Sequence, residues 1–140
     1  REYGSLGGYQ VSGSYSAAPS FTPADFDRNA WYLRTYPDVA AARLDPVLHY
    51  DRYGWKEGRD PQVLFDTDWY LQRNPDVAKA GVNPYRHFLD HGWKEGRDPS
   101  PLFDTSDYLG ANPDVAAARM NPLLHFEQYG YAEGRAIWPV

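Results

Sequence analysis

Hydrophobic side chains occur in short clusters, separated by Asn-Pro and Asp-Pro pairs and by glycines. In the middle of the chain, the segment TDWYLQR follows Asp66, a favourable N-cap, and is expected to form a first helix. The pairs Asn74-Pro75 and Asn83-Pro84 each supply an N-cap and a first helical residue for a further helix. Gly92 stands where a left-handed residue would end the last of these helices. The pattern therefore predicts three short helices, over 67–73, 75–80 and 84–91.

The same pattern occurs three times at a spacing of 38 residues. Pro-Asp-Val-Ala and Glu-Gly-Arg recur in every copy at this spacing. Helices shorter than roughly 12–15 residues are marginal in water, so these must be held by packing on neighbouring copies. We therefore expect an all-α tandem-repeat array of three units of three short helices, with units at 25–64, 65–102 and 103–140.

Residues 1–24 differ from the repeats, because they are rich in Gly and Ser and carry Tyr3, Tyr9 and Tyr15 at spaced positions. Two interpretations remain open. The segment is a flexible linker, or it is an extended arm whose tyrosines dock on the array or on a neighbouring subunit.

Composition narrows the possible partners. The formal net charge is −5 and no basic cluster interrupts it, which disfavours nucleic acid and anionic membrane surfaces. The absence of cysteine excludes disulfides and thiolate metal sites. No stretch reaches the roughly 18 apolar residues of a membrane span, and no motif calls for a cofactor.

Every copy carries an Asp, a His, a Glu and an Arg at fixed positions. In chain order these are Asp38, His49, Glu57 and Arg59; Asp76, His87, Glu95 and Arg97; and Asp114, His125, Glu133 and Arg135. We interpret them as structural, with each His packed beside aromatic rings and each Arg paired with an Asp of its own or the next unit. The glycine of each Glu-Gly-Arg triplet is expected to turn the backbone. A catalytic or metal-binding role is the weaker interpretation, since a single matched His per unit leaves them too far apart to share a metal. We therefore predict no catalytic residue, no metal site and no enzymatic activity.

The aromatic side chains are the better candidates for binding. Trp55 and Trp93 share one position after the third helix of their units, and Tyr131 takes that position in the last copy. These rings either seal the joints between units, the interpretation we favour, or bind sugar faces or a protein partner. Trp31 and Trp69 are expected in the core.

The motif FDxxWYLxxNPDVA from Phe65, followed by PxxHFxxxGWxEGRxP from Pro84, resembles tandem repeats of secreted and surface proteins of alphaproteobacteria and related bacteria. Such repeats often lie beside calcium-binding RTX-type regions, and similar units accompany some glycosyltransferases. The resemblance covers residues 26–140. It implies export and an accessory role, and it supplies no catalytic residue. The RTX nonapeptide is absent here, so calcium-dependent folding is not implied.

These observations together predict a non-catalytic structural or interaction module of a secreted or cell-envelope bacterial protein. It would assemble with itself or with another envelope or extracellular protein. The alternative is a glycan-binding module that uses exposed Trp and Tyr, with polysaccharide as the partner. The candidate binding residues are Tyr3, Tyr9, Tyr15, Trp55, Trp93 and Tyr131.

Overall fold

The computed structural model describes residues 20–140, and within this part of the chain the regular structure is helical. Tyr3, Tyr9 and Tyr15 lie outside the described residues. The helices follow one another as η2 (Pro23–Phe26), α1 (Arg28–Thr35), α2 (Pro37–Ala41), α3 (Pro46–Arg52), η3 (Gly54–Glu57), α4 (Thr67–Arg73), α5 (Pro75–Ala80), α6 (Pro84–Asp90), η4 (Gly92–Glu95), α7 (Thr105–Ala111), α8 (Pro113–Ala117), α9 (Pro122–His125) and η5 (Phe126–Gly130).

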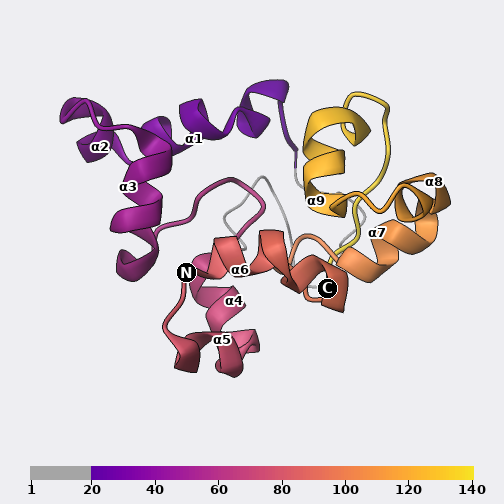
Figure 1. Cartoon of the computed structure of the whole chain (residues 1–140). Coiled ribbons are helices and arrows are strands. Elements are labelled where there is room, and N and C mark those ends of the chain that lie inside the picture. The colour runs from indigo at the N-terminus through magenta and orange to yellow at the C-terminus, as the bar shows by residue number, and fades with distance from the viewer. Residues whose placement is uncertain (1–19) are drawn as a thin grey trace, which may run out of the picture.

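The helices form three similar groups, α1–α3, α4–α6 and α7–α9, which we call units 1, 2 and 3 (Figure 1). The predicted array of three three-helix units is confirmed. In unit 2 all three helices begin where the sequence predicts, and α6 ends one residue early, at Asp90. In each unit the first helix contacts both the second and the third. A short 3₁₀ turn, η3 or η4, follows the third helix in units 1 and 2, whereas in unit 3 the π-helical turn η5 continues α9 directly.

Side-chain caps begin the first and third helices of each unit, whereas the second helices, α2, α5 and α8, have no side-chain cap. Asp66 accepts a hydrogen bond from the backbone N–H of Trp69 at 2.9 Å, and Asn83 accepts from two N–H groups at the start of α6. Asn74 is the N-cap residue of α5 and Pro75 its first residue, as predicted, but the Asn74 side chain makes no capping hydrogen bond. Its Nδ2 donates instead to the carbonyl of Tyr70 at 2.8 Å, and its Oδ1 accepts from Arg97.

Gly92 is not left-handed, which corrects the predicted role of this residue. It begins η4, and a Cβ built on it would collide with the hydroxyl of Tyr70. Close approach, rather than backbone conformation, therefore excludes a side chain here. The left-handed position is Gly96, with φ of 78°, in the Glu-Gly-Arg triplet, and Gly58 and Gly134 repeat it.

Tyrosine, not tryptophan, forms the centre of each unit. Tyr32, Tyr70 and Tyr108 are at most 1% exposed. Trp31 and Trp69, one residue earlier, are only partly buried, so their expected core positions are wrong. Successive helical residues point about 100° apart, and here the tyrosine faces the third helix of its unit. Trp69 lies instead under the guanidinium of Arg73, whose Cζ is 4.8 Å from the ring centroid.

The linkers between units belong to the core. Leu64 and Phe65 before unit 2, and Leu102 and Phe103 before unit 3, are at most 2% exposed. The Phe65 ring lies 5.0 Å from that of Tyr85 and 5.1 Å from that of Tyr70. The predicted unit boundaries therefore pass through buried Leu-Phe pairs, and a unit without its linker lacks part of its own core.

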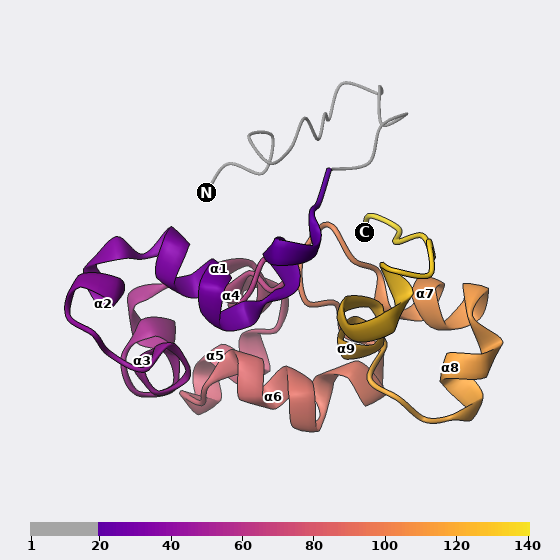
Figure 2. The same ribbon diagram turned by 90° about the horizontal axis from the view of Figure 1, so that it is seen from above.

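The first and third units are in direct contact. The Phe26 ring, at the end of η2, lies 5.7 Å from Phe126 and 4.9 Å from Tyr131. The Tyr131 hydroxyl donates to the carbonyl of Phe21. The start of the described chain accordingly lies beside α9 and η5 (Figures 1 and 2). Since units 1 and 2 also meet through the Tyr50–Tyr85 ring contact and units 2 and 3 through the Asp98–Thr105 bond, the three units close into a ring.

Candidate functional site

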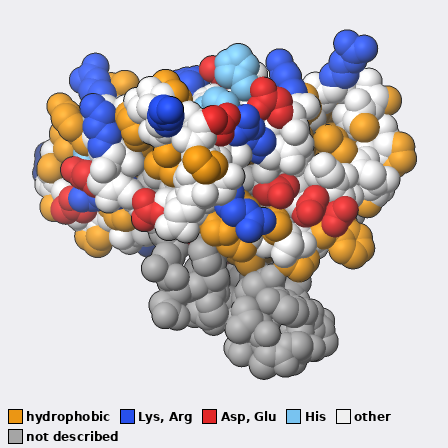
Figure 3. Space-filling model, turned by 90° about the horizontal axis from the view of Figure 1, so that it is seen from below, with side chains coloured by type: hydrophobic (Ala, Val, Ile, Leu, Met, Phe, Trp, Pro, Cys, Tyr) orange, Lys and Arg blue, Asp and Glu red, His pale blue; other side chains and the backbone are white. Residues whose placement is uncertain are grey.

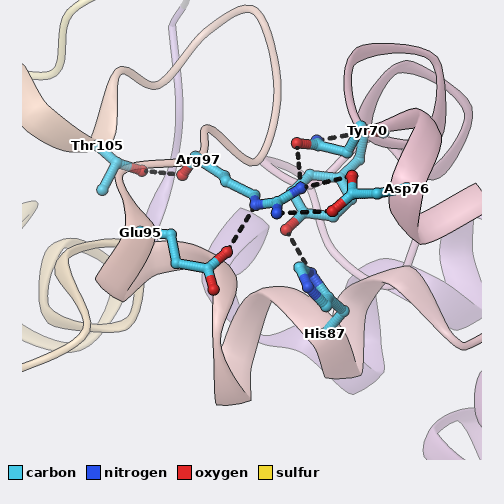
Figure 4. Close-up of polar contacts among 7 residues, drawn as sticks. Tyr70, Asp76, His87, Glu95, Arg97 and Thr105 are labelled. Carbon is cyan, nitrogen blue, oxygen red and sulfur yellow. Dashed lines mark hydrogen bonds and ion pairs between the residues drawn. The ribbon is translucent and has the colours of Figure 1, made fainter.

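The repeated polar residues form one network that recurs in all three units. In unit 2, Arg97 donates to both carboxylate oxygens of Asp76, at 2.9 and 2.8 Å, and to Glu95 at 2.8 Å (Figure 4). A further bond from Arg97 reaches Asn74 at 2.8 Å. Each arginine therefore pairs with the aspartate of its own unit. The corresponding Asp–Arg–Glu groups are Asp38, Arg59 and Glu57 in unit 1, and Asp114, Arg135 and Glu133 in unit 3.

This network clamps the start of the second helix to the Glu-Gly-Arg turn. The hydrogen bonds from Arg97 lower the pKa of Asp76 to about 2, and those from Arg135 lower the pKa of Asp114 to about 2. The forked, two-point geometry is the strong form of such a pair. Because the Asp76 side chain is 62% exposed, dissolved salt screens the attraction.

The three repeated histidines, His49, His87 and His125, are packed residues with one hydrogen bond each to a buried tyrosine. The hydroxyl of Tyr70 lies 2.9 Å from Nδ1 of His87 (Figure 4). The equivalent distances are 2.8 Å for Tyr32–His49 and 2.9 Å for Tyr108–His125. Burial lowers the pKa of His87. Within residues 20–140, no three His, Asp or Glu side chains gather closely enough to hold a metal ion.

The candidate aromatic residues divide into two kinds. Tyr131 lies in the seam between units 1 and 3, against Phe26. Trp55 and Trp93 are half-buried at the end of their units, where each Nε1 donates at 3.1 Å to the carbonyl four residues earlier. A lysine ammonium lies 5.6 Å from the Trp55 centroid and 5.8 Å from the Trp93 centroid. Trp55 and Trp93 thus both pack against the core, and the ring of each remains partly accessible to solvent.

Trp93 also lines a groove of about 490 Å³ between units 2 and 3. Its other lining residues are Lys94, Leu109, Ala116, Arg119 and Met120. The groove is mostly apolar, and both of its charged residues are cations. The sequence singled out Trp93 but not the partners of Trp93 from unit 3, because a repeat period does not show which surface of the next unit a residue contacts.

A buried polar cluster, which sequence reasoning missed, lies where the three units meet. Gln62 donates from Nε2 to the Tyr85 hydroxyl and to Glu127 Oε1, both at 2.9 Å. The Arg28 guanidinium lies 5.0 Å from the Tyr85 ring centroid. Burial raises the pKa of Glu127 to about 8. The available signal was a departure from the repeat, since the position of Glu127 is Asp51 in the first copy and a leucine in the second.

An apolar face on unit 1 is the second feature that the sequence did not reveal. Leu44, Leu48 and Tyr53 are 49%, 46% and 57% exposed and line a depression together with the polar residues Asp45, His49 and Arg52. On the face of the molecule shown in Figure 3, acidic and basic side chains intermingle with hydrophobic ones. That view contains no broad patch of a single charge.

The described helices are all too short or too polar to cross a lipid bilayer. Comparison with protein-family models, with curated proteins and with solved structures finds no match to the chain.

Proposed function

We propose that the chain is a non-catalytic interaction module that assembles with itself or with another protein of the bacterial cell envelope or extracellular space. The observation that carries the proposal is the apolar face formed by Leu44, Leu48 and Tyr53. Clustered, accessible apolar side chains of this kind mark association surfaces. The resemblance of the repeat to those of secreted and surface proteins supports the location.

The polar networks support a structural use of the repeated residues. The Asp, Glu and Arg side chains bind one another in the same way in every unit, and each His binds a tyrosine hydroxyl. Such reciprocal pairing is typical of groups that hold a fold together, whereas a catalytic group is directed at a substrate.

The apolar face recurs at the other end of the chain but is interrupted in the middle. Position 48 is Leu48 in unit 1, Arg86 in unit 2 and Leu124 in unit 3. Arg86 lies 3.7 Å from Asp51 of unit 1. In unit 3 the neighbouring Tyr129 is 51% exposed. Units 1 and 3 thus carry related apolar positions, with Leu124 partly buried, and two such faces of different copies can pack on each other.

Sedimentation and light scattering over a wide range of protein concentration test this proposal. The wild-type mass is expected to rise with concentration, whereas Leu48→Arg should remain monomeric. Because Arg86 already occupies the equivalent position in unit 2, Leu48→Arg should keep its helical circular dichroism and melting temperature. Gln72→Arg adds the same charge at an exposed position of α4 and should assemble like the wild type.

Two outcomes would contradict the proposal in different ways. A wild-type protein that stays monomeric at its highest soluble concentration would exclude self-assembly. Equal assembly of Leu48→Arg and the wild type would show that another surface is responsible. The alternative function, sugar binding by exposed rings, is supported by the groove between units 2 and 3.

A further inference from the structure

The groove between units 2 and 3 combines an aromatic ring, an apolar floor and positive charge. Trp93 lines the groove together with Leu109, Ala116 and Met120, and the charged lining residues are Lys94 and Arg119. Two cations in one groove contrast with the net charge of −5 of the chain. The lining therefore suits a ligand that has an apolar face and a negative charge.

Neither cation is held in an ion pair, although the Lys94 ammonium lies 5.8 Å from the centroid of the Trp93 ring. Arg97 and Arg135 have their guanidinium groups occupied by carboxylates. Arg119 and Lys94, by contrast, form no ion pair within 4 Å with any residue in the described part of the chain. Arg119 follows α8 in a left-handed conformation, with φ of 55°, and is exposed. This places an unpaired, planar donor at the edge of the groove.

The orientation of Trp93 is fixed from within its own unit. Its Nε1 donates to the carbonyl of Leu89 at 3.1 Å. The polar edge of the indole is thereby satisfied, and what remains is the ring, with the Lys94 ammonium 5.8 Å from its centroid. The electron-rich face of an aromatic ring attracts the slightly positive C–H groups of an apolar surface, so Trp93 favours a flat, C–H-bearing ligand.

We infer that this groove binds a uronate sugar of an acidic polysaccharide. The C–H face of the pyranose ring packs on Trp93 and the apolar floor, and the carboxylate accepts hydrogen bonds from Arg119, with Lys94 adding attraction. A planar carboxylate matches the fork of a guanidinium. An acidic peptide fits less well, because residues 20–140 contain no strand whose edge could pair with an extended backbone. The inference does not depend on self-assembly, which uses the face on α3.

The chain contains its own matched control for this site. The equivalent positions one repeat earlier are Trp55, Lys56 and Leu71, but Gly81 stands in place of Arg119. In the last copy, Tyr131 occupies the seam with Phe26. Arg119→Gly therefore recreates a residue that the fold already accepts at this position, with the same left-handed backbone in Gly81.

Calorimetric titration of the full chain with oligogalacturonate, together with indole N–H resonances in ¹⁵N NMR spectra, tests the inference. Oligogalacturonate is expected to bind and to shift the Trp93 resonance more than that of Trp55, with affinity falling as salt is added. Arg119→Gly should weaken binding by at least about tenfold, since it removes a charge-assisted fork. Trp93→Tyr should weaken it too, whereas Trp55→Tyr should not.

A neutral maltooligosaccharide and poly-glutamate complete the experiment. Neither should bind comparably, because the first lacks the charge and the second lacks the sugar face. Absence of oligogalacturonate binding, or binding that Arg119→Gly leaves unchanged, would overturn the inference. If maltooligosaccharide bound as tightly as oligogalacturonate, the carboxylate would not contribute to recognition, and the inference of a uronate ligand would be wrong. Equal or tighter binding of poly-glutamate would instead identify the groove as a site for acidic peptides.

Discussion

The hydroxyl of Tyr70 occupies the place where a side chain on Gly92 would begin. The same hydroxyl lies 2.9 Å from Nδ1 of His87 on α6. One tyrosine therefore links the first helix of the unit to the third and requires a glycine beside it. Tyr32 with Gly54, and Tyr108 with Gly130, repeat the arrangement.

Adding a methyl group at Gly92 should therefore destabilise the protein. Gly92→Ala forces the Tyr70 ring or the backbone to move, and overpacking of this kind costs about 1–3 kcal/mol. Gly110→Ala is the control, because a Cβ on Gly110 in α7 meets nothing within 4 Å. That change should raise the free energy of unfolding by about 0.5–1 kcal/mol. Urea denaturation measures both, and equal effects of the two substitutions would argue against the close approach.

One or two residues after the second helix of each unit, the backbone becomes left-handed, and two of the three residues in this conformation carry a side chain. Arg43 and Arg119 have φ of 56° and 55°, whereas the equivalent residue in unit 2 is Gly81 with φ of 66°. A left-handed conformation costs a residue with a Cβ roughly 1–2 kcal/mol. Arg43→Gly should therefore raise the melting temperature, although added freedom in the unfolded chain offsets part of the gain.

Two comparisons check this explanation for Arg43. Gly81→Ala should lower the free energy of unfolding by about 1 kcal/mol, because its Cβ meets no neighbour and only backbone strain is added. Ala41→Gly, in the right-handed helix α2, should also destabilise, by about 0.5–1 kcal/mol. Arg43→Gly and Ala41→Gly should thus have effects of opposite sign, and a shared sign would contradict the backbone argument.

The free energy of unfolding should decrease in acid, because protonation of the aspartates breaks the Asp–Arg pairs. Arg97 holds the pKa of Asp76 at about 2 in the folded protein, against an ordinary value of 3.8. Between these two pKa values, the Asp76 carboxylate is protonated in the unfolded chain but not in the folded protein. The stabilisation that the Asp76–Arg97 pair provides is therefore complete above about pH 4 and is lost as the pH falls to about 2. Asp76→Asn should flatten the dependence of the unfolding free energy on pH across this interval.

Salt provides the internal check on that experiment. Because Asp76 is 62% exposed, added salt should reduce the difference between wild type and Asp76→Asn. Parallel curves for the two proteins from pH 4 to pH 2 would show that the pair does not couple folding to protonation.

Glu127 should give the opposite pH dependence. Burial raises its pKa in the folded protein to about 8, against an ordinary 4.5, so the folded state keeps a proton that the unfolded chain releases. The contribution of Glu127 to the free energy of unfolding is therefore most favourable below about pH 4.5 and decreases as the pH rises towards 8. The nearby groups are the Arg28 cation, which opposes the rise in pKa, and Gln62 and Tyr85, which are neutral in this range.

Glu127→Gln should remove this decline and make the protein more stable than the wild type at pH 8. Its amide oxygen can still accept the bond from Gln62. Glu127→Leu, which copies Leu89 at the equivalent position of unit 2, should be equally insensitive to pH. Chemical denaturation from pH 5 to pH 8 measures these slopes, and a wild-type slope matching that of Glu127→Gln would contradict the assignment.

The helices could be predicted because their signals are local. Asp66 and Asn83 cap the helices that follow them, as expected from residues within one turn. Asn74 precedes a proline just as Asn83 does, yet its side chain is diverted by Arg97, which is 23 residues away in sequence. Such competition between a local and a distant partner is not visible in the local pattern.

The features that join the units could not be predicted from the period. Phe26 contacts Phe126 and Tyr131, which are far away in the sequence. A repeat pattern does not show whether the first and last units of an array contact each other. Glu127 and Gln62 form their bond at positions that vary between copies. The repeated Asp, Arg and His positions were recognisable as a set, because their partners also repeat.

The contact of Phe26 with Tyr131 also bears on how such a chain can change length. In an open solenoid, a copy can be gained or lost at little cost because each repeat touches only its neighbours. Here, removing or duplicating one copy would separate Phe21 and Phe26 of unit 1 from Tyr131 of unit 3. The apolar surfaces that these residues bury between the two units would then be exposed. Copy number is therefore a property of the whole fold, and unequal recombination within the repeats would produce chains that cannot close in the same way.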